Sequence, residues 1–84
     1  MEPIEIKVKG RVKLFEPNQS RQSFCIKVLN KDATLVVEWS NISYGVPGND
    51  ATVQIESAIP WKGEIFASSS EELAIQAYEI ENAG

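Results

Sequence analysis

The stretch of sequence that decides the fold reads Ile6-Lys7-Val8-Lys9-Gly10-Arg11-Val12-Lys13-Leu14. Cations alternate with apolar or small residues along it. Side chains of a β-strand point to opposite faces with a period of two, so the cations form one row and the apolar residues the other. The pattern predicts a long first strand over residues 4–15 with one cationic face. Gly10 interrupts the alternation and predicts a bulge or bend.

Alternation of the same kind recurs along the rest of the chain. It predicts further strands over residues 23–29, 34–40, 51–57 and 64–67. Four residues separate the second predicted strand from the third, which indicates a hairpin, so we expect these two strands to pair antiparallel.

Residues 41–50 contain the turn sequence Pro47-Gly48-Asn49-Asp50, and we expect an irregular loop there. Tyr44 and Val46 lie within this predicted loop. They would either cover an open end of the sheet or contact a partner.

The C-terminal residues 69–81 predict an α-helix. A serine followed three residues later by glutamate forms a capping box, available as Ser68 with Glu71 or Ser69 with Glu72. Apolar residues then follow at helical spacing and would pack on the sheet. They are Leu73, Ala74, Ala77 and Ile80. The predicted fold is therefore α+β: a four- to five-stranded, mostly antiparallel sheet, curved or partly closed, with one C-terminal helix packed on it.

Composition predicts a single folded domain over residues 1–84. Hydrophobic residues make up 43% of the chain and charged residues 24%, as in ordinary globular proteins. The one cysteine, Cys25, has no partner for an intramolecular disulfide, which favours a reducing compartment. The acidic N-terminus does not resemble a signal peptide, and no stretch is long and apolar enough to span a membrane. We expect a cytoplasmic protein.

The residues needed for most enzymatic chemistry are missing from the sequence. The chain has no histidine, so the commonest general base and metal ligand is absent. The five glycines are dispersed and form no phosphate-binding loop. Cys25 has only Lys27 as a local cation, and a thiol within a strand is more often simply buried. We therefore expect no enzyme activity, and no catalytic, cofactor-binding or metal-binding residues.

Charge is divided unevenly along the chain, which carries a net charge of −4. Residues 1–31 hold seven cations and three acids, whereas residues 32–84 hold one cation and nine acids. Basic and acidic strands could neutralise each other across the sheet. Alternatively, the acidic half could present negative charge to a basic partner.

The second interpretation predicts a non-enzymatic protein-interaction module, for example an inhibitor that occupies the cationic channel of a nucleic-acid-handling complex. In size, acidity and lack of catalytic groups the chain is broadly similar to small phage-encoded inhibitors, including anti-CRISPR proteins. The similarity involves no motif. The candidate partner-binding residues are Glu71, Glu72, Glu79, Glu81, Tyr44 and Trp61.

The alternative function is binding of single-stranded nucleic acid through the cationic strand. Alternate residues of a strand lie roughly 6.5–7 Å apart, close to the phosphate repeat. Aromatic residues that could stack on bases are also present. The cations are Lys7, Lys9, Arg11 and Lys13, and the aromatic residues are Phe15, Tyr44, Trp61 and Phe66. Against this, lysines also protect a strand edge from pairing, and the pI is about 4.7. Self-association through an unprotected edge is a third possibility.

Overall fold

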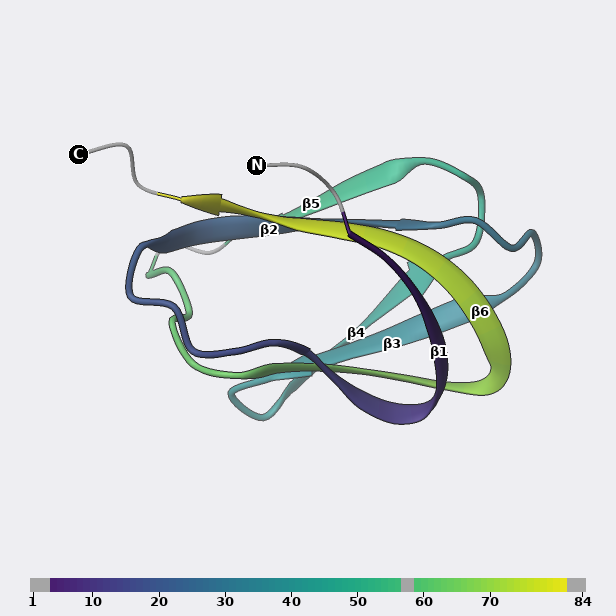
Figure 1. The fold of residues 1–84 in the computed structure, drawn as a ribbon, viewed down its shortest axis with the longest axis horizontal. Helices are drawn as coiled ribbons and strands as arrows, with labels where there is room; N and C mark the ends of the chain where they lie inside the picture. Colours follow the sequence, from purple (N-terminus) through teal and green to yellow (C-terminus); the bar gives the residue numbers. More distant parts are fainter. Residues whose placement is uncertain (1–3, 57–58, 82–84) are drawn as a thin grey trace.

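The structure is a computed structural model that describes residues 4–56 and 59–81 (Figure 1). These residues form six β-strands and no helix. The strands are β1 (Ile4–Phe15), β2 (Arg21–Val28), β3 (Thr34–Trp39), β4 (Ile42–Pro47), β5 (Thr52–Glu56) and β6 (Ile65–Glu81). Every pairing between them is antiparallel. The fold is therefore all-β. The α+β prediction is wrong, whereas the predicted antiparallel, curved sheet is present.

Residues 69–81, which we predicted to be a C-terminal helix, belong to strand β6. Leu73, Ile75 and Ala77 are buried and alternate with more exposed neighbours, so burial follows a period of two rather than about 3.6. β1 pairs with one side of this segment and β2 with the other. Pairing on both sides satisfies the backbone polar groups that a helix would have satisfied internally.

The serines and glutamates of the predicted capping box lie instead at a bend in β6. The backbone N–H of Glu71 donates to Oγ of Ser69 at 3.2 Å. This local bond is the kind by which serine side chains stabilise turns as well as helix N-termini. The predicted capping box is therefore wrong, because Ser68, Ser69, Glu71 and Glu72 lie within strand β6 and not at a helix N-terminus.

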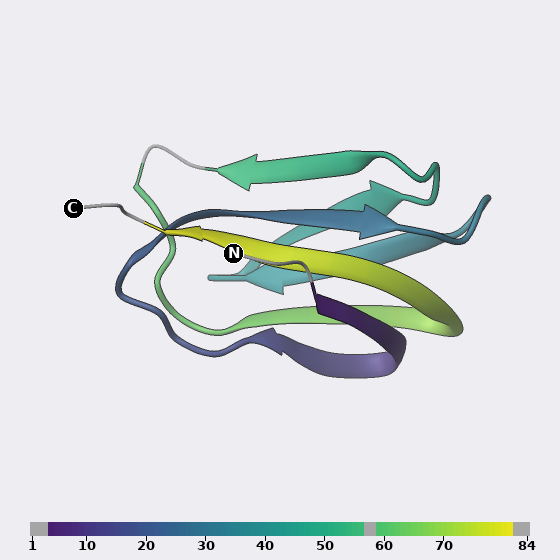
Figure 2. The same cartoon turned by 45° about the horizontal axis from the view of Figure 1, so that its top comes forward.

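The bend in β6 divides the sheet into two halves. Residues 73–81 lie between β1 and β2, and β5 continues that half beyond β2. Residues 65–69 lie between β1 and β3, and β4 continues that half beyond β3. β1 and β6 run through both halves, and Figures 1 and 2 show them curving together. The result is a half-barrel, an antiparallel sheet curled on itself.

β1 follows this curvature at Gly10, and the predicted bend there is confirmed. Gly10 has φ of +72°, in the left-handed region, and the register with β6 shifts between Val8 and Gly10. A Cβ atom at this position would meet no other atom within 4 Å. Glycine therefore serves the backbone conformation here, not a close approach between chains.

Strand β4 lies within residues 41–50, where we predicted an irregular loop. It joins β3 through a two-residue turn in which Ser40 and Asn41 have φ of 46° and 64°. Positive φ at both positions is the type I′ geometry that matches the twist of a hairpin. The predicted pairing of the second and third strands is wrong. β2 and β3 both pair with β6, but β2 pairs with its C-terminal part and β3 with its N-terminal part, so the link between them crosses from one half of the sheet to the other.

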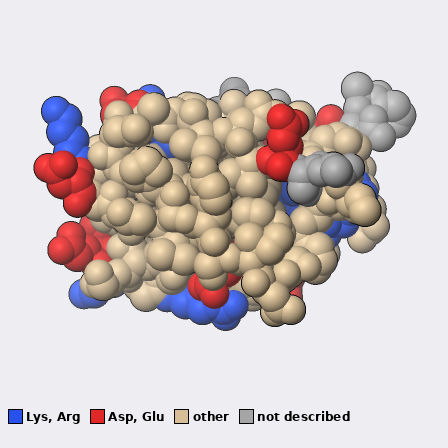
Figure 3. Space-filling view, turned by 180° about the vertical axis from the view of Figure 1, so that it is seen from behind, with Lys and Arg blue, Asp and Glu red and all other residues tan. Residues whose placement is uncertain are grey.

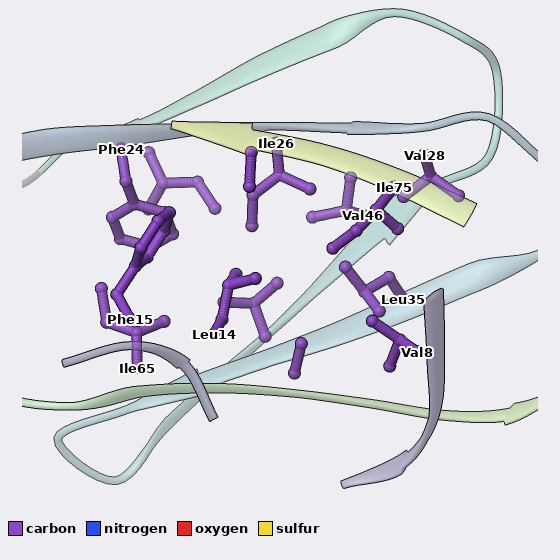
Figure 4. Packing of buried hydrophobic residues seen from close by; sticks show 14 of the residues in the cluster. Val8, Leu14, Phe15, Phe24, Ile26, Val28, Leu35, Val46, Ile65 and Ile75 are labelled. Carbon is purple, nitrogen blue, oxygen red and sulfur yellow. The ribbon is translucent and has the colours of Figure 1, made fainter. Parts of the chain in front are cut away.

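The core fills the space between the two halves (Figure 4). Inward-facing side chains from all six strands meet there. The buried hydrophobic cluster consists of Val8, Leu14, Phe15, Phe24, Ile26, Val28, Leu35, Val37, Val46, Ile55, Ile65, Ala67, Leu73, Ile75 and Ala77. Phe24 makes edge-to-face contacts with Phe15 and Trp39, with ring centroids 5.9 and 5.6 Å apart.

One arginine, Arg21, is buried at the end of this core, with 1% of its surface exposed. Its Nε donates to Oε2 of Glu79 at 2.7 Å. Its Nη1 donates to the backbone carbonyls of Trp61 at 3.0 Å and Gly63 at 2.8 Å. Its Nη2 donates to the carbonyl of Glu16 at 2.6 Å. Arg21 thus ties the segment before β6 and the turn after β1 to strand β6.

Ion pairs join the basic first part of the chain to its acidic remainder. They are Lys7–Glu72 (3.7 Å), Arg11–Glu38 (3.7 Å), Lys13–Glu64 (2.7 Å), Arg21–Glu79 (2.7 Å) and Lys27–Asp50 (3.6 Å). Neutralisation across the sheet, one of the two interpretations of the charge division, is therefore confirmed. On the face seen in Figure 3, charged side chains gather at the margins around an uncharged centre.

Within residues 4–56 and 59–81, no helix is long and apolar enough to cross a membrane.

Candidate functional site

A groove of about 440 Å³ opens beside the turn between β3 and β4. Three aromatic residues from different elements line it: Trp39 at the end of β3, Trp61 before β6 and Phe66 in β6. The turn and the start of β4, residues 40–43, form one wall. Both tryptophans of the chain therefore lie at this one concave site.

Trp61 is held in place by the segment that contains it. Its indole Nε1 donates to the backbone carbonyl of Glu64 at 2.8 Å. Its ring lies against Gly63, where an added Cβ would come within 2.5 Å of Cζ2. Arg21 fixes the same segment through its two bonds to backbone carbonyls. The ring is therefore preorganised, and it remains partly exposed to solvent.

The groove contains charged residues of both signs. The Arg11 guanidinium lies 3.9 Å from the centroid of the Phe66 ring, in a cation–π contact, and 3.7 Å from Glu38. Glu64, also in the lining, pairs with Lys13 at 2.7 Å. Hydrogen bonding to Glu64, and then to Glu16, raises the pKa of Lys13 above its usual value. Opposite charges therefore pair within and beside the groove, and its lining combines polar residues with three aromatic side chains.

The predicted cationic row does not form a free cationic face. Lys7 pairs with Glu72. Arg11 pairs with Glu38, and Lys13 pairs with Glu64. Among the residues that the structure describes, Lys9 makes no ion pair, and it lies at the bend in β1. β1 is an edge strand, paired only with β6. Of the four candidate cations, only Arg11 lines the groove.

The four acidic candidates are divided between two places along β6. Glu79 binds Arg21, and Nδ2 of Asn18 donates to Glu79 and Glu81 at 3.1 Å each. Glu71 and its neighbour Glu72 lie at the bend of β6 instead. A helix would have presented these residues together; the strand separates the two pairs.

Of the two aromatic candidates, one lines the groove and the other does not. Trp61 lines the groove, and Tyr44 is exposed on β4, the strand whose first residues form the groove wall. The sequence analysis singled out neither Trp39, which packs against the core and also lines the groove, nor Ile42. The alternation of Ile42, Tyr44 and Val46 was the available signal, but turn residues on both sides hid it.

Cys25 is buried and lies directly opposite Tyr78 in the pairing of β2 with β6. Hydrogen bonding of the Tyr78 hydroxyl to the Cys25 sulfur, coulombic interaction with Cys25 and burial raise the pKa of Tyr78. In the described parts of the chain, no group of three or more His, Cys, Asp or Glu residues could hold a metal ion.

Comparisons of the chain with protein-family models, with curated proteins and with solved structures gave no match.

Proposed function

We propose that this protein is a non-enzymatic interaction module that binds another protein through the groove between Trp39 and Trp61. The observation that carries the proposal is that both tryptophans line one concave surface. Protein interfaces concentrate their binding energy in aromatic residues seated at such surfaces. A rigid ring also loses little conformational entropy on binding, and Arg21 and Gly63 already hold Trp61 in position.

The overall charge supports a partner with a basic surface. The ion pairs neutralise five cations of the first part of the chain, and the chain still carries a net charge of −4. Asp32, Glu56 and Glu71 make no ion pair with another described residue. Excess negative charge speeds encounter with a positive partner. An inhibitor that occupies the basic channel of a nucleic-acid-handling complex is the narrower form of this proposal.

Selection of peptides from a phage-displayed random library, with the purified protein as bait, tests the proposal. Selected peptides are synthesised and titrated while tryptophan emission is recorded, because both tryptophans report on the groove. We expect basic peptides that change the emission. Ile42→Ala should weaken their binding about fivefold or more, since Ile42 lines the groove.

A matched control is provided by Ile4→Ala. Ile4 and Ile42 are 46% and 49% exposed, and only Ile42 lines the groove. Peptides that bind both variants as tightly as the wild type would show that the groove is not the binding site.

Single-stranded nucleic acid is a second candidate ligand, favoured by the position of Arg11 beside the groove's aromatic residues. A cation together with stacking platforms is the combination that such sites use. Oligo-dT should then change tryptophan emission, with an affinity that falls steeply as salt rises. Arg11→Gln should weaken binding, whereas Lys9→Gln, outside the groove, should have little effect. Unchanged emission with oligo-dT at low salt would eliminate this candidate.

A further inference from the structure

Within residues 4–56 and 59–81, the half-barrel leaves three strands with a free edge: β1, β4 and β5. Free edges present unpaired backbone groups, and proteins protect them with charges and bulges. β1 is protected in both ways, because it carries five charged residues and two register shifts. β5 is short and ends in Glu56, and Asp50 precedes it. These two edges disfavour addition of another strand.

Along Ile42–Pro47, β4 has no charge and no bulge, and Pro47 at its end is its one protective residue. The strand contains no charged residue, and its register with β3 is regular throughout. Ile42 and Tyr44 are 49% and 44% exposed, so apolar surface accompanies the free edge. The nearest charge across the hairpin, Glu38 opposite Ser43, is already paired with Arg11.

The backbone of β4 is arranged to accept a further strand. In a two-residue hairpin the residues flanking the turn, here Trp39 and Ile42, point their backbone groups at each other, and the direction alternates along the strand. The N–H groups of Ser43 and Gly45 therefore point away from β3. Pro47 occupies the next outward position, and because proline has no N–H it ends the series.

We infer that β4 pairs antiparallel with β4 of a second copy of this chain. Antiparallel pairing of a strand with itself has two-fold symmetry, so a single surface serves both copies. With Tyr44 opposite Tyr44 of the second copy, Ser43 of each copy lies opposite Gly45 of the other. The N–H of Ser43 then donates to the Gly45 carbonyl, and the N–H of Gly45 donates to the Ser43 carbonyl. This register leaves Pro47 outside the paired region and packs the two tyrosine rings together.

The two-fold pairing geometry points to a second copy, and charge limits where two copies can meet. Each copy carries a net charge of −4, so two copies repel wherever acidic surfaces face each other. The β4 edge itself brings only neutral residues together. β-Strand addition at this edge would also cover Ile42 and Tyr44, which the single chain leaves exposed.

Sedimentation velocity over a concentration series, together with amide exchange measured by NMR, tests this inference. We expect a dimer that forms as concentration rises, and slower exchange of the Ser43 and Gly45 N–H groups at high concentration than at low. Tyr44→Lys should raise the dissociation constant of the dimer about tenfold or more, because it places like charges opposite each other. Thr52→Lys adds the same charge to the β5 edge and should leave the dimer intact.

A protein that stays monomeric to millimolar concentration would overturn the inference. A dimer that forms without protecting Ser43 and Gly45, or that tolerates Tyr44→Lys, would overturn it as well, since it would use another surface. The exchange measurement uses the unmodified protein and does not depend on whether the variant folds. Peptide and nucleotide titrations play no part in this test, so its result is separate from that of the proposed function.

Discussion

Nε of Arg21 lies 2.7 Å from Oε2 of Glu79, and the two side chains are 1% and 15% exposed. Breaking a buried pair of this kind leaves a charge without compensation in a medium of low dielectric constant. Arg21 also donates to three backbone carbonyls, which would lose their partner. This pair therefore connects the stability of the fold to the position of Trp61.

We predict that Arg21→Ala lowers the free energy of unfolding by about 3–5 kcal/mol. Denaturant unfolding followed by circular dichroism measures the change. Lys7→Ala, which breaks an exposed pair with Glu72, is the control and should cost less than about 1 kcal/mol. If the two substitutions lowered the free energy of unfolding equally, the buried Arg21–Glu79 pair would stabilise the fold no more than an exposed ion pair does.

Gly63→Ala should displace the Trp61 ring, because the new methyl group would lie 2.5 Å from Cζ2 and 2.9 Å from Cε2. Overpacking of this kind costs about 1–3 kcal/mol. The Trp61 indole N–H resonance should shift, while the Trp39 resonance changes less. Gly45→Ala is the matched control: its methyl group would make an ordinary contact of 3.4 Å with Cγ2 of Thr34. An unmoved Trp61 resonance in Gly63→Ala would contradict the described packing.

Gly10→Ala should destabilise the protein by about 1–2 kcal/mol, because alanine is strained in the left-handed region. No neighbouring atom would be displaced, so the cost is conformational. Gly10→Asn should cost less, since asparagine tolerates positive φ better than alanine does. Thermal unfolding of the two variants distinguishes a conformational cost from a steric one. A steric cost would make the larger asparagine the more destabilising substitution.

Ionisation of Tyr78 should occur above the ordinary value of 10.0, because contact with Cys25 and burial favour the neutral hydroxyl. A pKa raised in the folded state contributes stability that is complete below the unfolded pKa and is lost as pH rises through the folded pKa. Alkaline titration by ultraviolet absorbance, in a Tyr44→Phe background, isolates the signal of Tyr78. Adding Cys25→Ala should lower the midpoint; an unchanged midpoint would assign the shift to another cause.

The β-strands near the N-terminus could be predicted from sequence because alternation there is unambiguous. Lys7, Lys9, Arg11 and Lys13 cannot face a core, so the period of two fixes which side of β1 is buried. Gly10 marked the bend for a local reason, its freedom to adopt positive φ.

The groove could not be predicted in the same way. Trp39, Trp61 and Phe66 come from three separate elements, and no spacing along the chain links them. Turn residues on both sides mask the alternation that signals β4, so the sequence predicts a loop where the wall of the groove lies.

Strand β1 and residues 69–81 show what the sequence determined and what the tertiary structure determined. The sequence by itself determined the charged strand β1 and its bend at Gly10. That its cations pair with acidic residues across the sheet was decided by the tertiary structure. The capping pattern and the helical spacing of Leu73 and Ala77 predict a helix over residues 69–81, but these two residues satisfy the period of a strand as well. Only the tertiary structure decided for the strand. β1 and β2 pair with both sides of that segment, and pairing together with burial of its inward face outweighs local helix preference.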